Sequence, residues 1–321
     1  MTTGILNTLS AAALGLTLAS AATSVMAEVE SSDPIKLTIN EWTGQVLTTN
    51  IAGALLGKMG YNVEYVTAGY FPQMTALQDN TVTAALEIWT TNIADAYDIA
   101  IGSGNVSDIG SLGIVPIETW FYPAHVEELC PGLPDWQALK DCPHVFATAE
   151  TIPQGRLVDY PADWGTSNRD RLAGLELPFT SIPAGSEGAL VAEIKTAFTR
   201  KTPLLVMFFS PHWSFSEYDL RPVALPPFEE GCDVDPAVGV NPSATFDCDF
   251  KRGDVRKVAW SGMADKWPGA HALLSALEIS NDQQIELINM VDQQGKTVEE
   301  AVNHWLAANE STWSAWIDAA K

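Results

Sequence analysis

Strand-like and helix-like segments alternate along the chain from Ile35 onward, and this alternation limits the possible folds more than any other feature. The segment KLTINEW (36–42) is typical of a strand, TTNIAGALLGKMG (48–60) of a helix ended by glycine, and YNVEYVTA (61–68) of a second strand. MTALQDNTV (74–82) is helix-like, and ALEIW (85–89) is again a strand. This order predicts an α/β fold with a largely parallel sheet, whose ligand sites lie beyond the carboxyl ends of the strands.

A second set of elements begins near residue 117. The strand-like GIVPIETWFY (113–122) leads into a stretch rich in Pro, Cys and Gly, which is followed by the helical AGSEGALVAEIKTAFTRK (184–201). PLLVMFFSPHW (203–213) then indicates a buried strand that ends in Trp213, and DVRKVAWSG (254–262) a further strand. The tail is helical, with N-caps predicted at Ser280 and at Thr297, where T-V-E-E fits a capping box.

The N-terminal residues 1–27 are predicted to be a signal peptide. ILNTLSAAALGLTLASAATSVMA is apolar, and it ends in Val25-Met26-Ala27, with small residues where a signal peptidase cleaves, although no Lys or Arg precedes it. We expect cleavage after Ala27 and export to the periplasm, with no membrane span in the mature chain.

The chain is strongly acidic, and this bears on its partners. Residues 1–27 contain no charged side chain, so the formal net charge of -23 belongs entirely to the mature protein. Nucleic acids and anionic membranes attract basic proteins, so we expect neither as a partner. The acidity is instead typical of a solvated surface.

Four cysteines fit an exported protein. Three connectivities are possible, but the short separations favour the local pairs Cys130 with Cys142 and Cys232 with Cys248. No zinc spacing is present, and no cofactor is indicated. The second cysteine loop and its borders carry acidic residues that offer a weak calcium candidate against the simpler interpretation of a solvated loop: Asp233, Asp235, Asp247 and Asp249.

Catalytic motifs are poorly formed. The Gly-Lys-Thr of QGKTVEE lacks the first glycine of a phosphate-binding loop, because Met290 occupies that position. AGSEG resembles a nucleophile elbow around Ser186 without its first glycine, and no spacing connects a histidine to it. We therefore expect no enzyme, and a hydrolase acting on a small amine or ester through Ser186 stays the alternative.

Tryptophan is the most informative residue type. Five of the 11 tryptophans stand at predicted strand ends or in loops with Pro or Gly: Trp42, Trp89, Trp120, Trp164 and Trp213. Glu-x-Trp occurs twice, in EIWTTN and ETWFYP, so Glu87 with Trp89, and Glu118 with Trp120, share a strand face if both segments are strands. A carboxylate beside an indole suits a cation; two half-buried strands with polar edges are the alternative.

In the order INEW, ALEIWTTN, ETWFYP, GSEGALVAEIKTAFTRKTPLLVMFFSPHWSFSEYDL and the tail from ISNDQQIELINMV, the chain resembles the glycine betaine, choline and proline betaine class of substrate-binding proteins of ABC importers. The resemblance runs from about Ile35 to the end. It implies a type II-like periplasmic-binding-protein fold, with lobe I formed by 28–118 and 218–321 and lobe II by 119–217. The chain crossings are expected near Pro116–Thr119 and Glu217–Leu220.

The resemblance also implies a site and partners. Aromatic side chains would box a methylated ammonium group in the cleft, and the matching positions are Trp42, Trp89, Trp120 and Trp213, with Trp164 in a less constant loop. The implied partners are a small methylated amine and an ABC transporter permease, for a receptor that we expect to be a soluble monomer. A sensor domain with the same fold is a third possibility.

The twin Glu-x-Trp pairs narrow the ligand. A carboxylate in the cleft attracts a methylated cation and repels a ligand that carries its own carboxylate. If Glu118 or Glu87 faces the ligand, trimethylamine N-oxide is favoured because it is small enough for indoles to enclose. Choline, glycine betaine and dimethylsulfoniopropionate are the alternatives.

Overall fold

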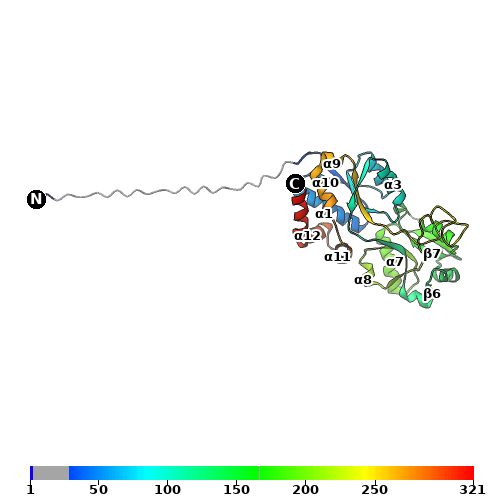
Figure 1. Cartoon of the computed structure of the whole chain (residues 1–321). Helices are drawn as coiled ribbons and strands as arrows, with labels where there is room; N and C mark the ends of the chain where they lie inside the picture. Colours follow the sequence, from blue (N-terminus) through cyan, green and yellow to red (C-terminus); the bar gives the residue numbers. More distant parts are fainter. Residues whose placement is uncertain (3–28, 166) are drawn as a thin grey trace.

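The computed structural model describes residues 1–2, 29–165 and 167–321, so residues 3–27 of the predicted signal peptide lie outside the described residues. The described chain forms two α/β lobes, each built on a five-stranded sheet. Figure 1 shows α1, α10 and α12 together in one lobe, with the C-terminus beside them, and α7, β6 and β7 in the other.

The sheet of lobe I has the strand order β2-β1-β3-β11-β4. β1 is parallel to β2 and β3, whereas β11 is antiparallel to both of its neighbours, β3 and β4. The strands are β1 (Ile35–Ile39), β2 (Val63–Thr67), β3 (Ala84–Trp89), β4 (Val106–Ser111) and β11 (Val255–Trp260). β3 is buried along its whole length, as its apolar sequence AALEIW predicts.

Eight helices belong to lobe I among the described residues: α1 (Thr43–Met59), α2 (Pro72–Gln78), α3 (Ala94–Gly102), α9 (Met263–Lys266), α10 (Pro268–Ala276), α11 (Asn281–Asp292), α12 (Val298–Ala308) and α13 (Glu310–Ala319). Gly60 ends α1 with a φ of 98°, a left-handed conformation that glycine adopts without strain. Both predicted N-caps are confirmed, because Ser280 and Thr297 form complete capping boxes on α11 and α12.

The sheet of lobe II has the strand order β10-β5-β9-β7-β8. Its strands are β5 (Ile117–Pro123), β7 (Gly155–Asp159), β8 (Phe179–Pro183), β9 (Val206–Ser210) and β10 (Leu220–Pro222), with β6 (Pro131–Pro134) outside the sheet. The helices here are η1 (Ala124–Glu128), α4 (Ala138–Asp141), α5 (Pro143–Phe146), η2 (Ala162–Trp164), α6 (Asn168–Gly174), α7 (Glu187–Arg200) and α8 (Ser214–Glu217).

The two chain crossings lie between strands of different sheets. The first falls between the end of β4 at Ser111 and the start of β5 at Ile117, so Ile117–Thr119 of the expected region already belong to the second sheet. The second was expected at Glu217–Leu220, but the structure places it later. β10 pairs with β5, Leu220 opposite Pro123, and therefore still belongs to the second sheet.

The segment after β10 also stays with lobe II. Arg171 of α6 donates from Nε to the Cys248 carbonyl at 2.8 Å, and Asn241 donates from Nδ2 to the Gly174 carbonyl at 2.8 Å. The return to lobe I is complete only at β11, since Val255 pairs with Trp89 of β3.

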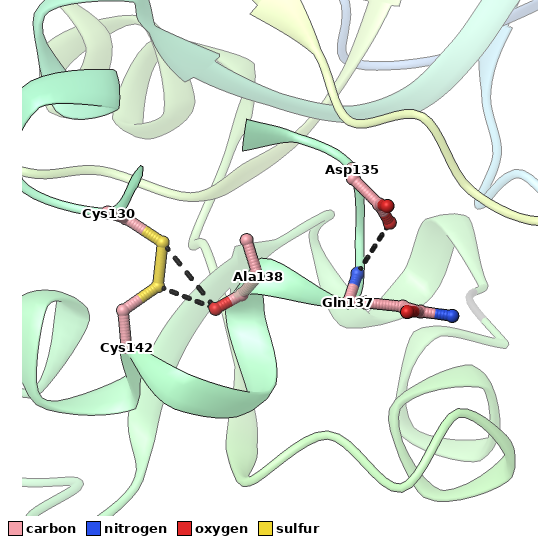
Figure 2. The surroundings of a disulfide bond; sticks show 5 residues. All are labelled: Cys130, Asp135, Gln137, Ala138 and Cys142. Atoms are coloured by element: carbon pink, nitrogen blue, oxygen red, sulfur yellow. Dashed lines mark hydrogen bonds between the residues drawn. A yellow bond between two sulfur atoms is a disulfide. The ribbon is translucent and has the colours of Figure 1, made fainter. Parts of the chain in front are cut away.

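The predicted local disulfides, Cys130–Cys142 and Cys232–Cys248, are both formed. Figure 2 shows the first, whose two sulfur atoms both face the Ala138 carbonyl oxygen from one side. Just before α4, the Asp135 side chain accepts a hydrogen bond from the Gln137 backbone N–H at 2.9 Å (Figure 2). This local turn fixes the chain between the two cysteines. No helix of the described residues has the length and apolarity that a membrane span requires.

Candidate functional site

A small cavity lies between the lobes and is lined mostly by aromatic side chains. Its volume is about 20 Å³, and its walls are Trp42, Tyr70, Trp89, Asn92, Glu118, Tyr160, Trp164 and Phe209. None of the six rings is more than 5% exposed, so water has little access to their faces. We refer to these six rings, Trp42, Tyr70, Trp89, Tyr160, Trp164 and Phe209, as the aromatic box.

Lobe I supplies three of the rings from the carboxyl ends of parallel strands. Trp42 follows β1 and is the N-cap residue of α1, Tyr70 follows β2, and Trp89 is the last residue of β3. Because the three strands are neighbours in the order β2-β1-β3, their ends meet at one edge of the sheet. The Tyr70 hydroxyl accepts a hydrogen bond from the Trp89 backbone N–H at 2.8 Å, which fixes the two loops to each other.

Lobe II closes the cavity from the other side. Tyr160 directly follows β7, Trp164 lies in η2, and Phe209 and Glu118 stand on the adjacent strands β9 and β5, opposite each other in the pairing. The site is therefore complete only when the lobes are in contact.

The rings of the aromatic box meet edge to face across the lobe boundary. Trp42 lies 5.3 Å from Trp164 at an interplanar angle of 67°, and Trp89 lies 5.4 Å from Phe209 at 82°. Within lobe I, Trp42 and Tyr70 are 5.2 Å apart at 84°. These are the edge-to-face arrangements that aromatic rings prefer, and an aromatic face that lines a cavity offers its negative quadrupole to a cation.

Glu87 holds the two indoles of lobe I from behind. Its Oε1 accepts hydrogen bonds from Trp42 Nε1 at 2.8 Å and Trp89 Nε1 at 3.1 Å, and its Oε2 accepts one from Gln284 Nε2 at 3.2 Å. Burial raises the pKa of Glu87, and the donors that surround it counteract this. Glu87 thus orients the box without lining the cavity, so it is a positioning residue.

Glu118 is the one carboxylate in the cavity wall. It is 4% exposed, it accepts a hydrogen bond from the Thr91 hydroxyl on Oε2, and Asn92 Nδ2 lies 3.4 Å from Oε1. Burial raises its pKa to about 7, although the hydroxyls of Thr91 and Tyr160 counteract part of that rise. The Tyr160 hydroxyl is buried beside this carboxyl group and lowers its pKa by donating towards it.

Two of the predicted box residues lie elsewhere. Trp120 is fully buried within lobe II, where its Nε1 donates to Asn168 Oδ1 at 2.6 Å and its ring meets Phe250. Trp213 lies three residues beyond the end of β9, and its Nε1 donates to Asp292 of α11 at 3.0 Å. Neither ring lines the cavity.

Sequence reasoning missed Tyr70, Asn92, Tyr160 and Phe209. A usable signal existed for the two tyrosines, since Tyr70 stands three residues after β2 and Tyr160 directly after β7. Phe209 was interpreted only as part of a buried strand, and Asn92, the last residue of the EIWTTN segment, was given no role.

The other candidate sites have structural explanations. Ser186, the residue of the incomplete nucleophile elbow, is the N-cap of α7 and accepts a hydrogen bond from the Ala189 N–H. Within residues 29–165 and 167–321, no group of three or more His, Cys, Asp or Glu side chains is arranged to hold a metal ion. Asp233, Asp235, Asp247 and Asp249 thus form no such group.

Comparisons with known proteins show the family to which the chain belongs. A family model described as the substrate binding domain of ABC-type glycine betaine transport systems matches residues 33–308. The chain belongs to this family. Its members bind solutes for ABC transporters and are not enzymes, so the prediction of a non-enzymatic receptor is confirmed.

Individual members of the family are also similar. The trimethylamine N-oxide-binding protein of Pelagibacter ubique (strain HTCC1062) is 27% identical over 292 residues, which cover 89% of this chain and 91% of that protein. Among solved structures, an ABC-transporter choline binding protein in complex with choline has a TM-score of 0.71 at 18% identity, covering 91% of this chain and 94% of its own. Lactococcal OpuAC, closed on glycine betaine, has a TM-score of 0.69 at 15% identity, covering 88% and 99%. These likenesses confirm the two-lobed fold.

Proposed function

We propose that this family member captures trimethylamine N-oxide in the aromatic box and delivers it to an ABC permease after export to the periplasm. The observation that carries the proposal is a water-poor cavity with six aromatic walls and a single carboxylate, Glu118. The similarity to a trimethylamine N-oxide-binding protein supports the same choice. The export step rests on the signal peptide predicted for residues 1–27.

The chemistry of the ligand explains the walls. A methylated ammonium group is positive, apolar at its surface and without an N–H donor, so a hydrogen-bonding site recognises it poorly. An indole or phenol face offers both apolar contact and a negative quadrupole, with about 0.5–2 kcal/mol for each desolvated face. A few such faces account for micromolar affinity, about -8 kcal/mol, after the costs of association.

The N-oxide oxygen adds a second requirement. It is a strong acceptor and needs a donor, which an ionised carboxylate cannot supply. Glu118 has a pKa of about 7, so its protonated form is available near neutrality, and its Oε1 has only a long contact with Asn92. The protonated carboxyl group of Glu118 thus gives the oxygen of trimethylamine N-oxide a donor in the cavity wall.

Other ligands fit the cavity wall less well. Choline would use Glu118 in its ionised form, as a counter-charge and an acceptor for the choline hydroxyl. Glycine betaine and dimethylsulfoniopropionate bring a carboxylate of their own, which ionised Glu118 repels, and no basic side chain lines the cavity. Choline is therefore the second candidate.

The direct test is isothermal titration of residues 28–321 with trimethylamine N-oxide, choline, glycine betaine and dimethylsulfoniopropionate in parallel. We expect micromolar or tighter binding of trimethylamine N-oxide and the weakest binding for the two carboxylates. Tight binding of glycine betaine would contradict the excluding role of Glu118 while leaving the transport role intact.

The pH dependence of affinity separates the two leading ligands. Between pH 8 and pH 6, an acid with a pKa of about 7 changes from mostly ionised to mostly protonated. Trimethylamine N-oxide, which needs the protonated form, should bind about tenfold more tightly at pH 6 because the competent fraction rises by that factor. Choline should show the opposite trend.

The matched control is Glu118→Gln, whose side-chain amide N–H donates a hydrogen bond at every pH. Titrations at pH 6, 7 and 8 should then give one constant affinity for trimethylamine N-oxide and stronger binding of glycine betaine than in the wild type. A slope that survives in Glu118→Gln would assign the pH dependence to another group.

A further inference from the structure

Five residues form a polar cluster at the boundary between the lobes, and this cluster is separate from the aromatic box. Thr43 and Asp292 belong to lobe I, and Glu187, His212 and Trp213 belong to lobe II. We call this group, Thr43, Glu187, His212, Trp213 and Asp292, the interlobe latch. None of the five lines the cavity.

The latch has two hydrogen-bonded connections across the lobe boundary. Glu187, the first residue of α7, accepts a hydrogen bond on Oε2 from the Thr43 backbone N–H at 2.8 Å. Trp213 Nε1 donates to Asp292 Oδ2 at 3.0 Å. Asp292 also receives the Thr43 hydroxyl on Oδ1 at 3.0 Å, so the two connections share Thr43 and act as one cluster.

His212 fills the centre of the latch. Ser214 N–H donates to its Nδ1 at 3.1 Å, so the proton of the neutral ring is on Nε2. That Nε2 lies 3.8 Å from Glu187 Oε1 and 3.9 Å from Asp292 Oδ2, too far for a hydrogen bond to either. Burial lowers the pKa of His212 to about 3 and raises that of Glu187 to about 8. The cluster is thus held by hydrogen bonds around a neutral imidazole and not by a buried ion pair with His212.

The latch is connected to the box in two ways. Thr43 follows Trp42 directly, so the N–H held by Glu187 adjoins a box residue. On the other side, a single face of α11 carries Asn281, Gln284 and Asp292, because these positions differ by close to whole turns of a helix. Gln284 reaches Glu87, which holds Trp42 and Trp89, and Asn281 bonds both backbone groups of Val115 at the first crossing.

Helix α1 packs tightly on this face of α11. A Cβ atom on Gly44 would lie 2.9 Å from Gln284 Nε2, a distance that forces one of the two to move. One helix pair, α1 with α11, therefore positions the start of α1, the residues that support the box and the latch. A displacement of one of these parts shifts the others, because the packing between the two helices is close.

We propose that Trp213, Asp292 and Glu187 are positioning residues that hold the lobes closed over the ligand, and that they set its release rate without touching it. The choice of trimethylamine N-oxide as the test ligand rests on the proposed function, whereas the closure of the lobes does not depend on it. The latch contacts form only when the lobes meet, so breaking them destabilises the closed state relative to the open one. The open state does not contain the complete box, and the ligand leaves from it.

The primary variant is Trp213→Phe, which keeps an aromatic ring against His212 and removes the Nε1 donor. A hydrogen bond to a charged group is worth enough to raise the dissociation rate of trimethylamine N-oxide about tenfold, with little change in the association rate. Stopped-flow tryptophan fluorescence measures both rates. In Asp292→Asn, a single acceptor oxygen remains for the two donors, the Trp213 indole N–H and the Thr43 hydroxyl. We therefore expect a similar increase in the dissociation rate.

The matched control is Trp313→Phe, which removes an indole donor bonded to the Leu306 carbonyl at 2.7 Å within lobe I. It should leave both rates unchanged. Glu187→Gln is the milder latch variant, because its amide oxygen still accepts the Thr43 N–H. It should retain most of the wild-type rate. If Trp213→Phe fails to fold, Asp292→Asn serves in its place.

Interlobe distances give a readout that a general loss of stability would not change. Spin labels at the exposed Ala192 of α7 and Glu299 of α12 report the separation of the lobes, with and without trimethylamine N-oxide. Trp213→Phe should shift the distribution towards longer distances, whereas the control Trp313→Phe should not. Unchanged distances and release rates would overturn the latch, whereas a wild-type protein that binds none of the four amines, but opens in Trp213→Phe, would overturn only the proposed ligands.

Discussion

Replacing Trp89 by alanine should weaken the binding of trimethylamine N-oxide about 100-fold, or about 2.7 kcal/mol. The substitution removes one of the three indole faces of the cavity and also the edge-to-face partner of Phe209, 5.4 Å away across the lobe boundary. Ligand contact and closure are therefore lost together, as for central hot-spot residues. Isothermal titration at fixed pH measures the change, and urea unfolding of the ligand-free variant measures the separate loss of stability.

A pair of identical substitutions tests the placement more finely. Trp89→Phe and Trp120→Phe each remove one indole N–H, bonded to Glu87 in the first case and to Asn168 in the second. The first should weaken binding about tenfold because the smaller ring leaves the cavity less enclosed. The second should change affinity by about twofold or less, since Trp120 lies outside the cavity wall. A larger loss of affinity in Trp120→Phe than in Trp89→Phe would mean that Trp120 contacts the ligand, and this would contradict the geometry.

The part of the site that sequence could predict follows from strand order. Trp42 and Trp89 come after β1 and β3, and neighbouring parallel strands bring their carboxyl ends to one edge. The shared strand face of Glu87 and Trp89 was also predicted, and the hydrogen bond from Trp89 Nε1 to Glu87 confirms it. Local periodicity sufficed here because each inference needed only a strand and its end.

Contacts between the lobes could not be predicted in the same way. Which residues of lobe II face the cavity depends on how the two sheets are turned towards each other, and no local pattern encodes this. Glu118 and Phe209 point to the cavity from the middle of the second sheet, whereas Trp213, after the turn beyond β9, reaches α11. The sequence indicated an exposed aromatic residue at Trp213 but not the direction of its side chain.

The second crossing was misplaced for a related reason. β10 has only three residues, LRP, and two of them are exposed, so it has neither the length nor the pattern of a core strand. Its place is set by antiparallel pairing with β5, a contact between residues about 100 positions apart. Short edge strands of this kind are determined by tertiary structure.

Glu87→Leu should have the largest effect on the protein as a whole. Leucine cannot accept hydrogen bonds, so the substitution leaves the Nε1 groups of Trp42 and Trp89 and the amide of Gln284 buried without their acceptor. At about 1–3 kcal/mol for each unsatisfied donor, the free energy of unfolding should fall by about 3–5 kcal/mol. The substitution also removes the cost of burying the Glu87 carboxylate, the burial that raises its pKa, and this offsets part of the loss. The saving for one carboxylate is smaller than the cost of three buried donors without an acceptor.

Glu87→Gln separates the acceptor from the charge. The amide oxygen of the new glutamine can still accept hydrogen bonds from both indole N–H groups. A rotation of the Gln284 side-chain amide would turn its oxygen towards the N–H donors of the new glutamine. We therefore expect the glutamine variant to lose only about 1 kcal/mol of stability and to bind trimethylamine N-oxide within about threefold of wild type. Urea unfolding and titration of the two variants side by side measure this. Because the ligand contacts the indoles and not Glu87, a leucine variant that folds yet binds normally would mean that ring packing alone orients Trp42 and Trp89.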